Sequence, residues 1–343
     1  MRLLPSLTAL PLILLTACGG GGSSTGGGGT VVTPTPTPTT SPSPTPPPTG
    51  TPSPSPSPLP TSWTNVAGYY DVQPDVASCR AGTIKQAVKD EFLARLNEIR
   101  ARHSLAPVTY STAEDVQEQE SSLMMAIAKT LSHTPPTSWQ CYTPAGATGA
   151  GASNLIGGWG TGLGFDSEDS LLAGWLREGG SPQLGHRRWI LHPFLGKTSY
   201  GRVSVVLPNG RRATTASMRV FSFAGGVPNS ASVPPYVAFP QGDYPIRYFA
   251  PTDYLSFSVV PSGTNNGADR NVDFGAATVT VRNAAGTNLT VTDVTRDNDG
   301  YGIANNIQWR VTGLASNTSY TVTIAGVRNA PQASYSYSFR ILP

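Results

Sequence analysis

The chain has 343 residues, of which 13% are charged, and its formal net charge is +3. So small an imbalance excludes the strongly basic surface that nucleic-acid binding requires, and we expect no nucleic-acid partner. Fifteen of the 32 Pro fall within the first 60 residues, which excludes a packed core in that part of the chain.

The first 18 residues carry the pattern of an export signal. Arg2 precedes an apolar run that is too short to span a bilayer, and no later run is long or apolar enough to do so. The sequence LTAC at 15–18 resembles the bacterial lipoprotein signal, in which the Cys is lipidated and becomes the first mature residue. The alternative is an ordinary export signal with an incidental Cys. The resemblance implies an exported protein anchored to the cell envelope through Cys18, and Gly19 favours the outer membrane or cell surface.

Residues 19–60 are Gly and Ser followed by Pro alternating with Thr and Ser. We expect a disordered linker with polyproline II in its Pro-rich part, because apolar side chains are too few to offset chain entropy. In the remaining body, 61–227 holds all four His and 15 Lys and Arg against 13 Asp and Glu. By contrast, 228–343 holds seven Arg, seven Asp and no Lys, Glu, His or Cys. This change predicts two domains with these bounds.

Cys79 and Cys141 both fall in the first of these domains. An exported protein folds in an oxidising compartment, which favours a disulfide between them. The alternatives are two free thiols or metal ligation, and neither has a CxxC-type spacing to support it.

Periodic apolar positions predict the first helix of the body. Residues 84–103 place Val88, Phe92, Leu96 and Ile99 on one helical stripe.

A second helix is expected over 113–131, with Val116 and Leu123 on its apolar face and acidic residues opposite. Two prolines at 135–136 prevent its continuation, so His133 is expected at its C-terminal end.

The rest of the first domain reads as loop, short helices and a hairpin. The loop is expected from Gly146 to Gly164, with a break at 153–156, and Asp166-Ser167 can cap the next helix. The remaining expected elements are a short helix carrying His186 to Ile190, strands at 200–207 and 217–223, and a turn at 208–210 between them.

Several short motifs occur in a characteristic order. They are LNEIR at 96–100, LSH at 131–133, Asn154-Leu155, Trp175 and Gly185-His186-Arg187. In this order they resemble the CAP superfamily, the secretory SCP/PR-1/Ag5 domain, over about residues 85–223. The resemblance implies an α+β fold, with an α-β-α sandwich around a central cleft that contains His133 and His186.

The family's two cleft glutamates flank these histidines. Glu178 matches one of them, whereas Ser153, followed by Asn154, stands where the family has the other. The resemblance therefore implies a cleft lined by His133, Ser153, Asn154, Glu178 and His186. His133, His186 and Glu178 are ligand types suited to Zn²⁺ or another divalent cation. The alternative is a hydrogen-bonded His–Glu pair without metal. We therefore expect a divalent cation as a possible ligand and not as a required cofactor.

Two functions remain open for this cleft. In the first, it binds a lipid, a sterol or another envelope ligand, as is commoner in the family. In the second, it is a metal-assisted hydrolase, protease-like or other, acting on envelope or extracellular substrates. No catalytic residue is identified. The sequence around Ser153, GASNL at 151–155, lacks the second glycine of a nucleophile elbow, and no Asp lies at a recognisable spacing to orient either His. Binding is the favoured function, and the chain is not expected to be an enzyme.

Other polar residues of the first domain have simpler interpretations. The Arg pairs at 187–188 and 211–212 either contact an anionic ligand or are solvated, and solvation is favoured. His103 and His192 match no cleft position and are read as surface or packing residues.

Residues 228–343 predict an all-β domain. The expected strands are 244–249, 254–260, 277–284, 289–296, 305–312, 319–327 and 334–342. Seven short strands resemble an immunoglobulin-like or fibronectin-III-like sandwich, with Trp309 in its core and a Tyr320 corner. Residues 297–300 look like half a calcium loop, but the downstream Glu is missing and a plain turn is preferred.

Overall fold

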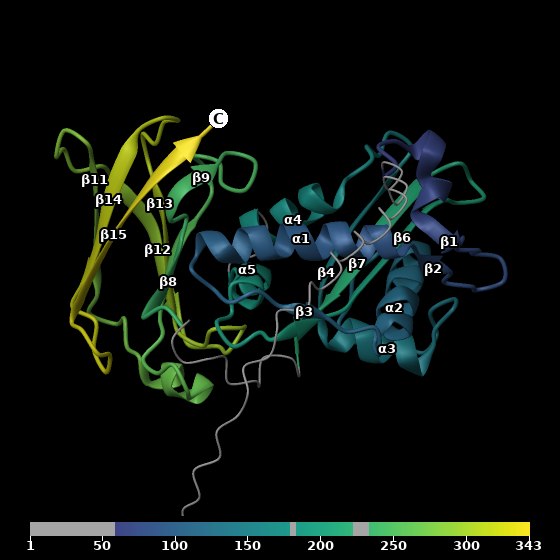
Figure 1. Ribbon diagram of the computed structural model, residues 1–343, viewed down its shortest axis with the longest axis horizontal. Helices are drawn as coiled ribbons and strands as arrows, with labels where there is room; N and C mark the ends of the chain where they lie inside the picture. Colours follow the sequence, from purple (N-terminus) through teal and green to yellow (C-terminus); the bar gives the residue numbers. More distant parts are fainter. Residues whose placement is uncertain (1–58, 179–182, 222–232) are drawn as a thin grey trace, which may run out of the picture. The chain divides into compact units, whose positions relative to one another are not determined.

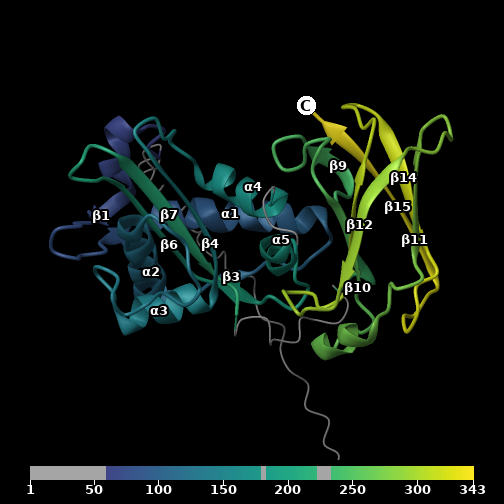
Figure 2. The ribbon, with the colours of Figure 1, turned by 180° about the vertical axis from the view of Figure 1, so that it is seen from behind.

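The structure is a computed structural model that describes residues 59–178, 183–221 and 233–343 (Figures 1 and 2). The predicted export signal, Cys18 and nearly all of the linker at 19–60 lie outside the described residues. The described residues belong to one compact unit. Within them, no helix combines the length and the apolar character needed to cross a membrane.

The first half of the described chain is an α-β-α arrangement. Its helices are η1 (Trp63–Tyr69), α1 (Gln86–Arg102), α2 (Asp115–Ala128), α3 (Pro144–Gly151), α4 (Glu168–Arg177) and α5 (Gly185–Ile190). Its strands are β1 (Tyr70–Val72), β2 (Thr83–Ile84), β3 (Thr109–Tyr110), β4 (Ser153–Gly160), β5 (Lys197–Thr198), β6 (Tyr200–Val206) and β7 (Arg212–Arg219). The main sheet is antiparallel with the order β4-β7-β6.

Helices cover both faces of this sheet, as Figure 1 shows. Tyr200 and Gly201 are neighbours on β6, so they face opposite sides. The Tyr200 ring stacks on Phe92 of α1 at 4.0 Å between centroids. Gly201 lies directly against the backbone of α2 at Glu118, where a Cβ atom would come within 2.3 Å of a backbone carbon. The two helices therefore lie on opposite faces, as the resemblance to the CAP fold implied.

Helix α1 confirms the predicted stripe, because Val88, Phe92, Leu96 and Ile99 are all fully buried. Helix α2 differs from the prediction in length. It ends at Ala128, and Lys129 follows in the left-handed conformation with φ 54°, so the helix stops well before the prolines.

The predicted face of α2 was right only in part. Leu123 is buried as expected, but Val116 is 63% exposed and Glu118, expected on the opposite face, is fully buried. The buried face runs through Glu118, Ser122 and Met125, at the four- and three-residue spacings of one helical stripe. Small and polar residues lie on this face because the helix packs closely on the sheet.

The loop predicted from Gly146 to Gly164 is wrong for most of its length, because the region forms α3 and the eight-residue strand β4, which begins at the expected break at 153–156. Pro144 begins α3, and the Thr143 hydroxyl caps it by accepting a hydrogen bond from the Gly146 amide at 2.9 Å. At Gly149 a Cβ atom would lie 2.3 Å from the Gln117 carbonyl oxygen. The glycines therefore permit close packing of α3 on α2 instead of marking a loop.

The hairpin after α5 follows the prediction in part. Strand β6 and the turn at 208–210 are where they were expected, with Gly210 at φ 76°. Strand β7 begins at Arg212 and not at Ser217, because residues 212–218 all pair with β6. Residues 222–223 of the predicted strand lie outside the described residues.

The second half is a β-sandwich with two four-stranded sheets, β12-β13-β10-β8 and β11-β14-β15-β9. The strands are β8 (Tyr236–Phe239), β9 (Gly242–Pro245), β10 (Leu255–Val259), β11 (Thr278–Asn283), β12 (Val291–Asp297), β13 (Asn306–Val311), β14 (Ser319–Ala325) and β15 (Ser334–Leu342). A 3-10 helix, η3 (Asn266–Asn271), lies between β10 and β11. The sheets meet through their aromatic side chains, such as Phe257 of β10 with Tyr335 of β15 at 5.3 Å between centroids.

Most predicted strands of this half are present, and the exceptions lie near its start. Strand β8 was missed, and the strand expected at 244–249 ends at Pro245. Trp309 is fully buried, as expected. The Tyr320 hydroxyl accepts a hydrogen bond from the Ala315 amide at 2.8 Å, which confirms the predicted corner.

The predicted disulfide between Cys79 and Cys141 is confirmed. It joins residues 62 apart in the sequence, so in the chain-entropy model it contributes about 4 kcal/mol to stability.

Buried polar contacts link the two halves of the described chain, and their apolar side chains form one continuous cluster. The Arg187 guanidinium donates to the Tyr254 carbonyl at 2.9 Å and to the Ser256 hydroxyl at 3.1 Å. His103 Nε2 lies 3.0 Å from the Tyr244 hydroxyl. The expectation of solvated side chains at Arg187 and Arg188 was therefore wrong, because both are buried in this contact.

Candidate functional site

All five residues predicted to line the cleft border one cavity of about 380 Å³. The cavity is also bordered by Gln183, Trp189 and Phe221 from the first half and by Tyr301 from the β-sandwich. Its walls therefore combine polar groups with three aromatic rings. Most lining residues come from β4, α5 and the loops around them, and Tyr301 comes from the loop between β12 and β13.

Glu178 orients His186. Its Oε1 accepts from His186 Nδ1 at 2.9 Å and from the His186 amide at 3.1 Å, and its Oε2 accepts from the Arg187 amide at 3.1 Å. The carboxylate thus caps the start of α5, where unpaired amides and the helix dipole favour a negative charge. Since Nδ1 donates to Glu178, the neutral ring keeps its lone pair on Nε2.

His133 is held in the same way by a different acceptor. Its Nδ1 donates to the Ala150 carbonyl at the end of α3, at 2.9 Å. His133 lies in the loop after α2 and not at the helix end where it was expected, so this carbonyl and not a helix dipole sets its orientation. Both cavity histidines therefore use Nδ1 as a donor and leave Nε2 as an acceptor.

The side chain of Ser153 is hydrogen-bonded to a carboxylate, that of Glu118, although the residue at position 153 itself is not acidic. The Ser153 hydroxyl donates to Glu118 Oε2 at 2.6 Å, and the Ser217 hydroxyl donates to the same atom at 2.5 Å. Arg219 Nη1 lies 3.5 Å from Glu118 Oε1. Burial raises the pKa of Glu118 to about 7, against the lowering effect of the two hydroxyls and Arg219. Sequence reasoning missed Glu118 because it was assigned to the acidic, exposed face of its helix.

The aromatic side of the cavity is formed by Trp189, Phe221 and Tyr301. The rings of Trp189 and Phe221 lie 4.6 Å apart between centroids, whereas Tyr301 is 46% exposed. No Lys or Arg is among the described residues that line the cavity. Arg187 and Arg188 are next to His186 in sequence, but their guanidinium groups donate to backbone carbonyls instead.

The two remaining histidines of the chain lie outside this cavity. Both are buried, which confirms the packing interpretation and excludes the surface one. Burial lowers the pKa of His103 and the pKa of His192 to about 3, so both rings stay neutral in the folded protein.

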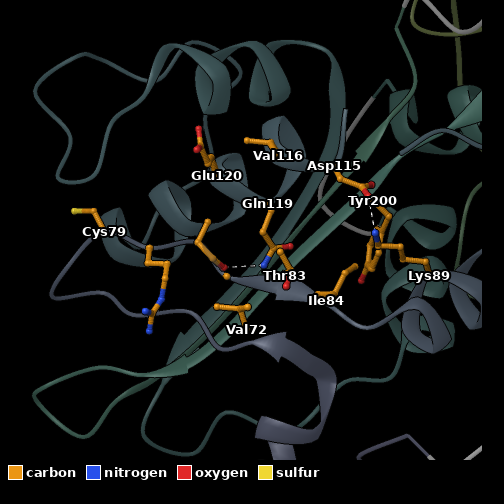
Figure 3. A pocket seen from close by; sticks show the side chains of 13 residues that line it. Val72, Cys79, Thr83, Ile84, Lys89, Asp115, Val116, Gln119, Glu120 and Tyr200 are labelled. Carbon is orange, nitrogen blue, oxygen red and sulfur yellow. Dashed lines mark hydrogen bonds and ion pairs between the residues drawn. The ribbon is translucent and has the colours of Figure 1, made fainter. Parts of the chain in front are cut away.

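A second cavity of about 340 Å³ lies between residues 72–84 and α2 (Figure 3). It contains no histidine. Several of its polar groups are paired: Lys89 forms an ion pair with Asp115, and Gln119 donates to the Ala81 carbonyl at 3.0 Å. The histidine cavity is the better candidate site, because its imidazole Nε2 atoms remain available.

The residues around the histidines offer a divalent cation only a small set of ligands. Among the described residues, no group of three or more His, Cys, Asp or Glu is arranged to hold a metal ion. Glu178 was predicted as a ligand, but its Oε1 already accepts two hydrogen bonds and its Oε2 accepts one. Glu178 therefore orients His186 through its Nδ1 atom and leaves the Nε2 atom of the ring to a ligand.

Comparison with known proteins gives a match to one family model and matches to solved structures. Residues 93–204 match the family model described as CAP, the cysteine-rich secretory protein family. A solved structure similar to the chain is that of an outer surface protein from Borrelia burgdorferi, with a TM-score of 0.26 and 12% identity. The match covers 39% of this chain and 92% of that chain, and a score this low supports no argument about fold or function. No curated protein matches the chain.

Proposed function

Because residues 93–204 form a CAP domain, we propose that the chain binds an uncharged sugar ring of a cell-envelope component in its histidine cavity. The observation that carries this proposal is the pairing of an aromatic wall with imidazole groups whose Nδ1 atoms are already hydrogen-bonded, in a cavity whose described lining residues include no Lys or Arg. The sugar belongs either to an envelope glycan or to the head group of a glycolipid.

The chemistry of a sugar ring fits the two sides of the cavity. One face of a pyranose presents C–H groups that pack on aromatic rings, and its hydroxyls donate hydrogen bonds at the edge. Trp189 and Phe221 supply the aromatic surface, and the Nε2 atoms of His133 and His186 supply acceptors. A volume of about 380 Å³ is near the lower end of the range for ligand pockets, roughly 300–1,000 Å³.

Other envelope ligands fit the cavity less well. An acyl chain would cover the imidazoles without offering them hydrogen-bond donors, and a sterol would offer only its single hydroxyl for two acceptors, which is unfavourable for buried polar groups. A phosphate head group would bring negative charge near Glu178, and no described lining residue carries a positive charge to balance it.

The proposed location is the cell envelope. The sequence LTAC at 15–18 supports lipidation of Cys18 and a membrane anchor. The Pro-rich linker after it would hold the two folded halves away from the membrane. From there the cavity can reach envelope material.

The second candidate is a metal-assisted hydrolase, and the two Nε2 lone pairs are the observation that favours it. His133 and His186 fit a weakly held divalent ion such as Zn²⁺, with Glu178 orienting His186 from behind. A bound ion would lower the pKa of a water molecule and polarise a substrate oxygen. His133 and His186 would hold the ion, and Ser153 and Asn154 would contact the substrate.

The test is calorimetric titration of the detergent-solubilised full chain with N-acetylglucosamine trisaccharide. We expect weak saturable binding that is lost in His186→Ala and retained in Thr134→Ala, which changes an exposed residue beside His133. Parallel titrations with glycolipid vesicles, phosphatidylglycerol vesicles and Zn²⁺ distinguish the sources and the alternatives. Binding of phosphatidylglycerol alone, or of no sugar in either form, would contradict the proposal.

A further inference from the structure

We propose that the C-terminal β-sandwich is part of the ligand site, because it supplies Tyr301 as a wall that contacts the bound sugar. This inference rests on the function proposed above for the histidine cavity. It assigns the second half of the chain a role in recognition, beyond that of a spacer.

Tyr301 lies at the rim of the cavity, next to the start of α5. A Cβ atom built on Gly185 would be 3.4 to 3.6 Å from atoms of Tyr301, so the ring lies beside the residue that precedes His186. Its side chain remains 46% exposed, and no described residue hydrogen-bonds its hydroxyl. A large aromatic side chain kept exposed over polar groups is available to a ligand.

Arg188 holds the loop that carries Tyr301. Its guanidinium donates to the Ile303 carbonyl at 2.8 and 3.0 Å and to the Ala304 carbonyl at 2.7 Å. It also forms an ion pair with Asp297 at 2.7 Å. The two ends of the loop are thus bound to one side chain from α5. A buried guanidinium with this many acceptors fixes the loop relative to the cavity.

The backbone of the loop is equally close to α5. Gly302 has φ 65°, and a Cβ atom there would lie 2.5 Å from the backbone carbon of Arg188. Only glycine fits such an approach without displacing the loop. On its other side, the loop is held by Asp269, which accepts from the Ala304 amide at 2.7 Å.

These contacts hold the loop of Tyr301 in place before a ligand binds. A residue fixed before binding loses little conformational freedom when the ligand arrives. Tyr301 borders the same cavity as Trp189 and Phe221, so a sugar ring bound there contacts both halves of the chain. The affinity for the sugar depends on the β-sandwich as well as on the CAP domain.

The first test compares three variants of the full chain by calorimetric titration with N-acetylglucosamine trisaccharide. Tyr301→Ala is expected to weaken binding about tenfold, and Tyr301→Phe is expected to keep most of it, because the ring makes the contact. Ile246→Ala is the matched control, since Ile246 is an exposed apolar residue of the same half outside the cavity. If wild type binds and Tyr301→Ala binds equally well, the inference is overturned and the proposed function stands.

A second measurement does not require sugar binding. Diethyl pyrocarbonate acylates neutral imidazole, and peptide mass spectrometry reports the rate at His186 separately from the other histidines. Tyr301→Ala is expected to raise the His186 rate at least twofold, because the ring covers this side of the cavity. An unchanged rate would show that Tyr301 is no wall of the site. If no sugar binds to wild type, the proposed function fails, and with it the ligand assigned to Tyr301.

Discussion

Two pairs of residues, His186 with Glu178 and His133 with Ala150, set the chemistry of the cavity. Each imidazole donates from Nδ1 to a fixed oxygen, at 2.9 Å in both cases. This arrangement selects the tautomer with an acceptor at Nε2. The same two lone pairs serve a sugar hydroxyl or a divalent ion, so the histidines alone do not decide between binding and hydrolysis.

The first prediction concerns a divalent ion at these histidines. Zn²⁺ is expected to bind weakly, and His133→Ala or His186→Ala should each reduce the affinity at least tenfold, because each removes one of two nitrogen ligands. Calorimetric titration of Zn²⁺ measures this, with Thr134→Ala as control. Equal affinity in wild type and both His variants would show that the two rings do not form one metal site.

The second prediction concerns Glu118 and the pH dependence of stability. Its folded pKa of about 7 is above its ordinary value of 4.5, so the folded state holds the proton more tightly. Stability from this group is complete below pH 4.5 and is lost as pH rises to about 7, by about 3 kcal/mol at about 1.4 kcal/mol per pKa unit. Glu118→Gln should not show this loss.

Urea unfolding of wild type and Glu118→Gln at pH 4.5 and pH 8 tests this prediction. His103 and His192 titrate in the opposite direction, because burial lowers the pKa of each to about 3. Their contribution cancels in the comparison, since both proteins contain them. A difference between the two proteins that does not change with pH would mean that folding does not raise the pKa of Glu118.

At the scale of elements, periodicity predicted those parts that bury a regular stripe. Helix α1 and most strands of the sandwich were found this way, because their buried positions recur at fixed spacing. Helix α3 was not, since its sequence, PAGATGAG, resembles a loop. Its glycines are explained only by α2, which packs on it and cannot be located from the sequence of α3.

The candidate site, like the fold, was predictable only in part from the sequence. The resemblance to the CAP superfamily located His133, Ser153, Asn154, Glu178 and His186, and the structure places them around one cavity. Glu118 and Tyr301 were missed because their positions depend on contacts between distant segments. Arg188 and Ile303, for example, are 115 residues apart in the sequence.

The third prediction tests the close contact between α2 and α3. Gly149→Ala should lower the free energy of unfolding by about 2 kcal/mol or more, because its Cβ would overlap the Gln117 carbonyl oxygen, which is backbone. Gly162→Ala is the matched control, since no atom lies within 4 Å of its Cβ position. Urea unfolding of both variants provides the comparison, and equal stabilities would show that the helices are farther apart than described.

At the scale of the whole molecule, the two halves of the described chain share one apolar cluster and several buried polar contacts. Arg187 is central to this contact. Its guanidinium lies 3.9 Å from the centroid of the Phe239 ring and donates to carbonyls of both halves. The link makes the geometry of the cavity depend on the β-sandwich.

The fourth prediction follows from this link. Scanning calorimetry of wild type should show the CAP domain and the β-sandwich unfolding in one transition. Arg187→Ala should lower stability by about 3 kcal/mol, because it leaves buried carbonyls without donors. It should also separate the transition into two. Ile246→Ala should do neither, and two transitions in wild type would mean that the halves are independent.

The central claim is that one cavity, built from both halves, holds a sugar ring between aromatic and imidazole side chains. Saturation-transfer difference NMR on N-acetylglucosamine trisaccharide with the full chain tests it most directly. The claim predicts that the ring C–H protons receive the strongest saturation and that the signal falls in both His186→Ala and Tyr301→Ala. Absence of saturation transfer at millimolar sugar, or equal transfer in wild type and both variants, would contradict it.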